Sequence, residues 1–402
     1  MSAGSLRVIV VVGARPNFVK VAPIVRAMAA WNVSDGARLR FCPVLVHTGQ
    51  HYDPAMSSLV WDDVGLPEPD YFLGVGSGSH AEQTAAVMVE LEKVLRTEQP
   101  HLGVVVGDVN STLAAALVCA MEGVPVAHVE AGLRSGDRTM PEEVNRLLTD
   151  HLSDLLFTTC PDGDVNLVAE GIPQDRLRRV GNTMIDSLER CRDAALRSPI
   201  LDDLGLAPRR YCLVTLHRPA NVDDDVGLDR LVGFLGWVSE SLPVVYPVHP
   251  RARVGLGRLA TKRADPLRLL LVDPAGYVDF VRLMSMARLV LTDSGGVQEE
   301  TSVLGVPCVT LRSSTERPVT IAEGTNHLVS ADDLDLARRV VREILDEKTD
   351  YAPRRPALWD GHAGVRVVEA IAEWASTAGA GKTAAVVAGE DQEAKKHARP
   401  VR

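Results

Sequence analysis

Three carboxylates surround one short arginine-bearing loop in the segment HVEAGLRSGDRTMPEEVNR, residues 128–146. They are Glu130, Asp137 and Glu142. Carboxylates in one site can be tuned to different pKa values, so that one donates a proton while another accepts it. The segment follows a strand-like run and leads into a helical pattern, where α/β proteins place their active sites. Asn145 and Arg146 share the helix face of Glu142, which predicts an ordered polar cluster.

Each acid or base candidate also has a structural alternative. The start of the following helix matches a capping box, with Thr139 as N-cap, Pro141 at the first position and Glu142 at the capping-box position. Considered by itself, Glu142 therefore fits a capping role. Asp108 follows an apolar run in GDVNS and is either a catalytic carboxylate or a helix N-cap, the commoner role of an isolated Asp. His217 in LHRP is either a cleft acid or base or a surface loop residue. The residues alone leave these alternatives open.

The run LVLTDSGGVQEETSVLG predicts a strand that turns into a helix through Ser294, Gly295 and Gly296. Two glycines let backbone amides approach an anion closely, and the helix dipole favours negative charge there. The alternative is a tight turn with Ser294 as an ordinary N-cap. Glu299 and Glu300 favour the phosphate interpretation, because a carboxylate one turn further on accepts hydrogen bonds from ribose hydroxyls.

Cations that suit a phosphate group occur at two other places. Arg15 and Lys20 lie in GARPNFVK after the first apolar run, and Arg317 lies in STERP. Neither GARPNF nor GVGSGS has the GxGxxG spacing that a dinucleotide-binding fold requires after a strand. This argues against a bound nicotinamide, and we expect no cofactor.

The elements that must position these residues follow a regular rhythm. Apolar, β-branched runs such as RVIVVVGARPN and HLGVVVGDVNS are each followed by a helical pattern, which predicts βαβ units and mainly parallel sheets. The rhythm restarts after a polar helical stretch at 186–208, with YCLVTLHRP, LPVVYPVHP and ARLVLTDSGG. A capping box of Ser79 and Glu82 predicts the start of one helix. The pattern therefore indicates two α/β domains.

Composition excludes several classes of protein. A chain of 402 residues is long enough for two such domains. The net charge of −10 is scattered and no dense basic stripe occurs, which argues against nucleic acid as a partner. The six cysteines form no CxxC pair, which predicts reduced thiols in a cytoplasmic enzyme without a metal site. LRVIVVVGARPNF is too short to span a bilayer, so we expect no membrane association.

Eight motifs in order carry a resemblance to a known family. They are GARPNFVKVAPI, HTGQHYDPAMS, GDVNSTLAAAL, HVEAGLRSGDRTMPEEVNRLLTD, VGNTMIDSL, LVTLHRPANVD, VYPVHPR and LTDSGGVQEE with the LGVPCVTLR and TERP that follow it. Together they resemble the non-hydrolysing UDP-N-acetylglucosamine 2-epimerase family across nearly the whole chain. The resemblance implies a glycosyltransferase-B-like α/β fold, in which two Rossmann-like domains with parallel sheets face a cleft. It implies an N-terminal domain at 1–182, a nucleotide-binding domain at 183–363, a helix at 364–377 that returns to the first domain, and a disordered tail at 378–402.

The same resemblance implies roles for individual residues. The positions that match the family's catalytic residues are Asp108, Glu130, Glu142 and His217. The positions that match its substrate-binding residues are Arg15, Lys20, Phe280, Ser294, Gly295, Gly296, Glu300 and Arg317, with the diphosphate at the DSGG turn, the ribose at Glu300 and the uracil at Phe280. The implied protein is a homodimer that acts on a UDP-sugar.

The chemistry expected of such a site is inversion at C2 of an N-acetylhexosamine. That carbon has no adjacent carbonyl, so its hydrogen is poorly acidic, and without a nicotinamide motif the residues favour elimination of UDP and re-addition. The expected reaction interconverts UDP-N-acetylglucosamine and UDP-N-acetylmannosamine. The alternatives are a relative that acts on a modified UDP-acetamido sugar, one that hydrolyses UDP, a glycosyltransferase of the same fold, and a catalytically silent sensor.

Overall fold

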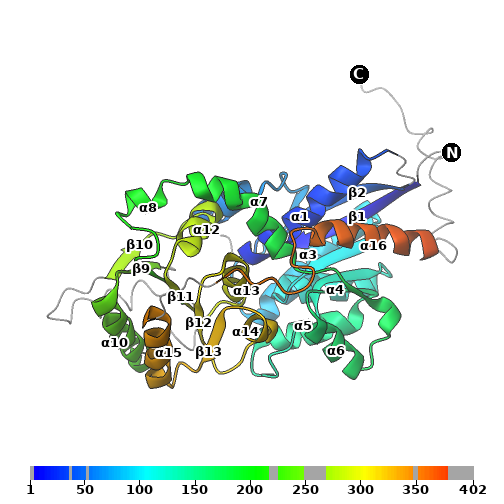
Figure 1. The fold of residues 1–402 in the computed structure, drawn as a ribbon. Helices are drawn as coiled ribbons and strands as arrows, with labels where there is room; N and C mark the ends of the chain where they lie inside the picture. Colours follow the sequence, from blue (N-terminus) through cyan, green and yellow to red (C-terminus); the bar gives the residue numbers. More distant parts are fainter. Residues whose placement is uncertain are drawn as a thin grey trace.

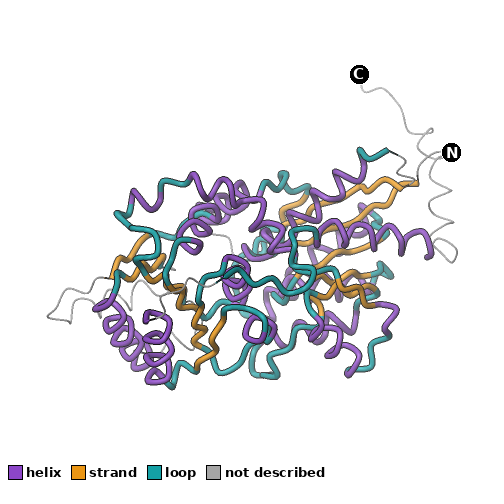
Figure 2. Tube along the Cα trace, viewed as in Figure 1, coloured by secondary structure: helices purple, strands orange, loops and turns teal. Residues whose placement is uncertain are grey.

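The computed structural model describes residues 4–35, 39–50, 54–216, 225–248, 269–346 and 352–378. Two sheets lie side by side with helices around them (Figures 1 and 2). The first sheet contains β1 (Gly4–Val12), β2 (Leu39–His47), β3 (Tyr71–Phe72), β4 (Leu102–Val106), β5 (Val126–Ala131), β6 (Leu155–Thr158) and β7 (Leu177–Arg179). The second contains β8 (Cys212–Thr215), β9 (Val244–Pro247), β10 (Leu269–Val272), β11 (Leu289–Thr292), β12 (Cys308–Leu311) and β13 (Asn326–Val329).

Both sheets have the strand order of a Rossmann fold. The first runs β3-β2-β1-β4-β5-β6-β7 and the second β10-β9-β8-β11-β12-β13. Every pairing within these described strands is parallel, which confirms the predicted α/β class. The order reverses beside β1 and beside β8, and ligands of open α/β sheets bind at the carboxyl ends of strands next to such a reversal. Arg15, Asp108 and Ser294 follow strands beside a reversal, and Glu130 lies near the carboxyl end of β5.

The helices that cover the first sheet are α1 (Arg15–Asn32), α2 (Pro54–Val64), α3 (His80–Glu98), α4 (Asn110–Met121), α5 (Pro141–Leu152) and α6 (Pro161–Ala169). A short 3₁₀ helix at Gln174–Arg176 precedes β7, and α7 (Thr183–Arg197) and α8 (Ile200–Asp203) follow it. The second half contains α10 (Asp225–Ser241), α12 (Tyr277–Ser285), α13 (Gly295–Leu304), α14 (Val319–Ala322), α15 (Leu334–Asp346) and α16 (Ala363–Ala378). The predicted capping box of α3 is confirmed, because the Ser79 hydroxyl accepts from the Glu82 amide at 3.3 Å and Glu82 accepts from the Ser79 amide at 2.9 Å.

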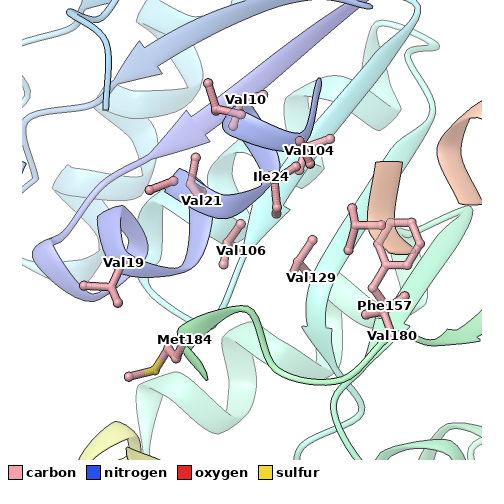
Figure 3. Close-up of a cluster of buried hydrophobic side chains, with 14 of the residues drawn as sticks. Val10, Val19, Val21, Ile24, Val104, Val106, Val129, Phe157, Val180 and Met184 are labelled. Atoms are coloured by element: carbon pink, nitrogen blue, oxygen red, sulfur yellow. The ribbon is translucent and has the colours of Figure 1, made fainter. Parts of the chain in front are cut away.

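Alternating residues of each strand supply cores on opposite faces of its sheet. Val8 and Val10 of β1 belong to the core that α1 covers, whereas Ile9 and Val11 belong to the core on the other face. This alternation follows from the two-residue period of a strand. Figure 3 shows the first of these cores, where Val10 and neighbouring strand residues lie next to Ile24 of α1.

Two edge strands were not predicted. β3 has only two residues and so carries no periodic pattern, and β13 begins with Asn326 and His327 rather than with an apolar run. Both strands lie at the outer edge of a sheet. They pair there because a neighbouring strand offers backbone partners, which local sequence does not reveal.

The last described helix, α16, packs against α1 beside the first sheet (Figure 1). Gly364 lies so close to α1 that an added Cβ would stand 2.8 Å from the Pro23 backbone. The Asp186 carboxylate of α7 accepts from the Ala363 amide at 3.0 Å and the Gly364 amide at 2.7 Å, which stabilises the N-terminus of α16. Ala378, predicted to begin the tail, is instead the last residue of α16, and 379–402 lie outside the described residues.

Candidate active site

Glu130 occupies an unusual backbone position near the end of β5. Its φ of 72° lies in the left-handed region, which is uncommon for a residue with a side chain. The register between β5 and β6 shifts between Val129 and Ala131, so Glu130 is the extra residue of a bulge. Bulges re-aim side chains next to functional sites. The bulge thus gives Glu130 a direction that the regular alternation of β5 would not give it.

The Glu130 carboxylate joins the two halves of the molecule through buried ion pairs. One oxygen accepts from the Lys20 ammonium of α1, and the other accepts from Arg317 Nη2 at 2.6 Å. Arg317 lies 187 residues further along the chain, between β12 and α14. Burial acts to raise the pKa of Glu130, but the two cations outweigh it and hold that pKa below its ordinary value. Glu130 is therefore an ionised carboxylate between two cations.

Arg317 is surrounded by carboxylates. Besides Glu130, its Nη1 lies 2.5 Å from Glu316 and its Nε lies 3.0 Å from Glu299. Burial would lower the pKa of Arg317, but these carboxylates raise it well above its ordinary value. Burial raises the pKa of Glu299 to about 7, against the opposing effect of Arg317. Arg317 is a permanent cation fixed from several sides.

The DSGG turn brings Arg317 against the start of α13. Ser294 is the N-cap residue by backbone position, but its side chain makes no capping hydrogen bond, and the helix ends at Gly305, as predicted. A Cβ on Gly295 would stand 2.4 Å from Arg317 Nη1, and one on Gly296 would stand 2.6 Å from Met184 Cε. Both glycines therefore allow another side chain to lie close to the start of α13. The site therefore combines the positive end of a helix with a guanidinium group, which suits an anion.

Asp108 belongs to a second cluster, on the first sheet. Its Oδ2 accepts from Arg146 Nη2 at 2.8 Å, and its backbone carbonyl accepts from the Asn145 side chain at 2.9 Å. Arg146 Nη1 also donates to Glu143 at 2.5 Å. The N-cap of the following helix α4 is Val109, so Asp108 is not that N-cap. The predicted polar cluster on α5 exists, but its glutamate is Glu143.

The predicted capping box at the start of α5 is wrong. The N-cap is Met140, so Pro141 and Glu142 take the first two positions of the helix, and the Thr139 hydroxyl donates to Asp137 at 2.6 Å. Glu143 performs the structural role instead, since it accepts from the Ser135 and Gly136 amides at 3.0 Å each. Glu142 is half-buried beside it. Because the two glutamates are adjacent, the sequence does not indicate which of them binds the preceding loop.

The remaining predicted residues divide between the two halves. Arg15 is half-buried at the first position of α1, one turn before the buried Lys20. In the second half, Glu300 of α13 is buried and accepts from the Tyr277 hydroxyl at 2.6 Å. Phe280 lies three residues after Tyr277 on α12, half-buried against the core of the second sheet. His217 lies outside the described residues.

Glu300 yields a prediction about stability. Burial raises its pKa to about 7 from an ordinary 4.5. Its contribution to stability is therefore fully present below pH 4.5 and is lost as pH rises through about 7. Between pH 4 and pH 8 we expect the free energy of unfolding to fall by about 3 kcal/mol more in the wild type than in Glu300→Gln, whose amide oxygen still accepts from Tyr277. Urea unfolding at both pH values measures this, with the exposed Glu323→Gln as control. Parallel pH dependence in wild type and Glu300→Gln contradicts the prediction.

A pocket of about 580 Å³ opens beside the Asp108 cluster. Asn110 and Asn145 line it together with residues from the starts of α3 and α5.

Within the described ranges, no group of three or more His, Cys, Asp or Glu side chains is arranged to hold a metal ion. All six cysteines are free thiols. Within those same ranges, no helix has the length and apolar character needed to cross a membrane.

The fold and the cluster between the sheets define a glycosyltransferase-B-like protein with two Rossmann-type sheets. A sucrose-phosphate synthase from Thermosynechococcus elongatus shares this fold at a TM-score of 0.59, with 14% identity over 94% of this chain and 100% of that one. At that identity the likeness shows the fold alone. The predicted fold class is confirmed.

Closer relatives identify the family. The family model for UDP-N-acetylglucosamine 2-epimerase matches residues 36–372. The UDP-N-acetylglucosamine 2-epimerase of Methanocaldococcus jannaschii is 38% identical over 91% of this chain and 99% of its own. The chain belongs to the UDP-N-acetylglucosamine 2-epimerase family and is an isomerase, which confirms the resemblance seen in the motifs.

Two further comparisons bear on the substrate. The structure of the M. jannaschii UDP-GlcNAc 2-epimerase in complex with UDP-GlcNAc and UDP is similar at a TM-score of 0.82, with 37% identity over 91% of this chain and 99% of that one. A UDP-2,3-diacetamido-2,3-dideoxy-D-glucuronate 2-epimerase of Pseudomonas aeruginosa is 40% identical over 81% of this chain and 89% of its own.

Proposed function

We propose that this enzyme interconverts UDP-N-acetylglucosamine and UDP-N-acetylmannosamine by elimination and re-addition of UDP. A base removes the C2 proton, the C–H electrons form the C1–C2 double bond, and UDP leaves with the electrons of the C1–O bond. In the reverse addition UDP attacks C1 of the 2-acetamido glycal, and an acid protonates C2 on the other face. Proton transfer on two faces needs at least two acid or base groups.

The observation that carries this proposal is the Lys20–Glu130–Arg317 cluster between the two sheets. A departing diphosphate needs positive charge fixed in place before the reaction begins. Arg317 over the N-terminus of α13 supports that role, and Glu130 beside it supports proton transfer. We propose that the diphosphate competes with Glu130 for Arg317 and thereby releases the Glu130 carboxylate for chemistry.

The other roles proposed for this site follow the family positions. Asp108, Glu142 and His217 join Glu130 in handling protons, and Arg15 joins Lys20 and Arg317 in neutralising phosphate charge. Ser294, Gly295 and Gly296 hold the diphosphate, Glu300 the ribose and Phe280 the uracil. The hydrogen bond from Tyr277 supports the ribose role, because it fixes the Glu300 carboxylate near the start of α12.

We also propose the domain division at 182/183, a homodimer and a cytoplasmic location. The two separate sheets and the packing of α16 on α1 support the division. Family membership supports the dimer, which light scattering of the purified protein tests. The free cysteines are consistent with a reducing compartment.

The proposed mechanism predicts solvent exchange at C2. In deuterium oxide, turnover of UDP-N-acetylglucosamine should place deuterium at C2 of the UDP-N-acetylmannosamine formed, because the returning proton comes from a side chain that exchanges with water. Nuclear magnetic resonance of the product mixture measures this, and added NAD should change nothing.

Two other results of the same experiment are informative. Retention of the original C2 hydrogen overturns elimination with exchange, even if epimerisation occurs. Turnover of the 2,3-diacetamido uronic acid nucleotide in place of UDP-N-acetylglucosamine assigns the protein to the modified-sugar branch, which the similarity to the P. aeruginosa enzyme makes the second candidate.

A further inference from the structure

His128 lies two residues before Glu130 and is completely buried. Each nitrogen of its ring lies within hydrogen-bond distance of an oxygen atom. Nδ1 is 2.6 Å from Asp150 Oδ1, and Nε2 is 2.8 Å from the Gly107 carbonyl. A carbonyl oxygen and an ionised carboxylate only accept, so His128 bonds to both at once when each ring nitrogen carries a proton.

Asp150 is held as a carboxylate by its surroundings. Its Oδ2 accepts from Arg134 at 2.7 Å and from the Gly132 amide at 3.1 Å, while Oδ1 faces His128. Burial acts to raise the pKa of Asp150, but His128 and Arg134 together hold it below its ordinary value. Asp150 is therefore an acceptor for the His128 ring.

The pair touches every segment of the first sheet that carries a proposed catalytic carboxylate. Gly107 immediately precedes Asp108, and Gly132 follows Glu130 by two residues. Asp150 lies near the end of α5, the helix that begins at Pro141 and carries Glu142. One buried imidazole ring thus connects the turn after β4, the bulge of β5 and α5.

Gly107 also contacts the central ion pair directly. An added Cβ on Gly107 would stand 3.2 Å from Lys20 Nζ and 3.3 Å from Glu130 Oε2, so its backbone packs against both groups. The Gly107 amide donates to the Val129 carbonyl at 3.0 Å, next to Glu130. A displacement of Gly107 therefore moves both Asp108 and the surroundings of the Glu130 carboxylate.

We propose that His128 is a positioning residue, whose two hydrogen bonds fix the Asp108 turn and the Glu130 bulge relative to each other and to α5. This inference rests on the proposed function, because it assigns His128 to the alignment of carboxylates that handle protons. His128 itself does not reach the substrate, since its ring is enclosed between Asp150 and Gly107.

Two substitutions divide the two hydrogen bonds of His128. The Asn side chain of His128→Asn places a donor near the position of Nδ1, and the Gln side chain of His128→Gln places one near the position of Nε2. We expect kcat to fall about 10- to 100-fold in both variants, with the KM for UDP-N-acetylglucosamine and the Kd for UDP changed less than about two-fold. The reason is that misplacement of catalytic groups affects the chemical step, whereas the anion-binding groups of the second sheet are untouched.

Misaligned protonation should also let more intermediate escape. We expect the ratio of released 2-acetamido glycal to epimerised product to rise in both variants. Turnover is normalised to the amount of protein that binds UDP, so that unfolded protein does not count as a loss of activity. His151→Asn is the matched control, because His151 neighbours Asp150 in the chain but is exposed. The control should keep the wild-type kcat and product ratio.

The outcomes separate this proposal from the proposed function. Wild-type protein that binds UDP but does not epimerise the substrate overturns the function, whereas an active wild type with unchanged kcat in folded His128 variants overturns only the positioning role. A loss confined to KM or to thermal stability also overturns it. If neither variant folds, ¹⁵N resonances of the wild-type His128 ring decide: two protonated nitrogens support the proposal, and a neutral ring overturns it.

Discussion

Glu142→Gln is expected to lower kcat by about 100- to 10,000-fold, the usual contribution of a general acid or base, with little change in the free energy of unfolding. The half-buried Glu142 occupies the second position of α5, beyond the N-cap, and its neighbour Glu143 is the residue that binds the preceding loop. An amide at 142 therefore removes a proton-transfer group while leaving the helix start intact. Steady-state kinetics and urea unfolding measure the two effects.

Glu143→Gln is the matched comparison for this prediction, since it makes the same chemical change one residue away. Glu143 is buried, pairs with Arg146 and accepts from two backbone amides. We expect the free energy of unfolding to fall by about 3 kcal/mol, because a buried cation loses one of its partners. Near-normal turnover in Glu142→Gln, with the loss of activity found in Glu143→Gln alone, would remove Glu142 from the residues that handle protons.

Glu130→Gln is expected to impair both activity and stability. The carboxylate is shared by Lys20 and Arg317, which are both buried, and removal of one partner from a buried ion pair costs about 3–5 kcal/mol. Turnover should fall by about 100- to 10,000-fold as well, if Glu130 transfers a proton. Thermal unfolding and steady-state kinetics measure these two losses, and Glu122→Gln at the exposed pair with Arg96 should cost less than about 1 kcal/mol.

UDP distinguishes the electrostatic role of Glu130 from a purely structural one. In Glu130→Gln the two cations lack their shared carboxylate, so a bound diphosphate supplies the negative charge that they have lost. We expect saturating UDP to raise the Tm of Glu130→Gln by more than it raises the Tm of the wild type. Equal increases in both proteins would show that Lys20 and Arg317 do not bind the diphosphate.

Local sequence predicted much of the fold because its signals act over short distances. Alternating apolar runs specify strands, and the Ser79 and Glu82 pair specifies where α3 begins. The DSGG turn into α13 and its end at Gly305 were also predicted, since glycine and helix-capping preferences are properties of a few adjacent residues. β3 and β13 were missed because edge strands form on a neighbour rather than from their own pattern.

The assignment of residues within the site shows where local signals stop. Glu142 and Glu143 are chemically identical neighbours, and only the path of the loop before α5 determines that Glu143 accepts from Ser135 and Gly136. The two glycines of the DSGG turn predicted an approach to an anion, but the close contacts in the structure are with Arg317 and Met184. The sequence did not predict a role for His128, because its partners Gly107 and Asp150 lie about 20 residues away on either side.

The sequence by itself determined the two sets of βαβ units, the polar strand ends and, through its ordered motifs, the family. Only the tertiary structure decided that Glu130 meets Lys20 from 110 residues away and Arg317 from 187 residues away. The reason is physical: periodicity and capping depend on neighbours along the chain. The direction of Glu130 depends instead on a bulge between two strands, and its second cation arrives only when the two sheets pack against each other.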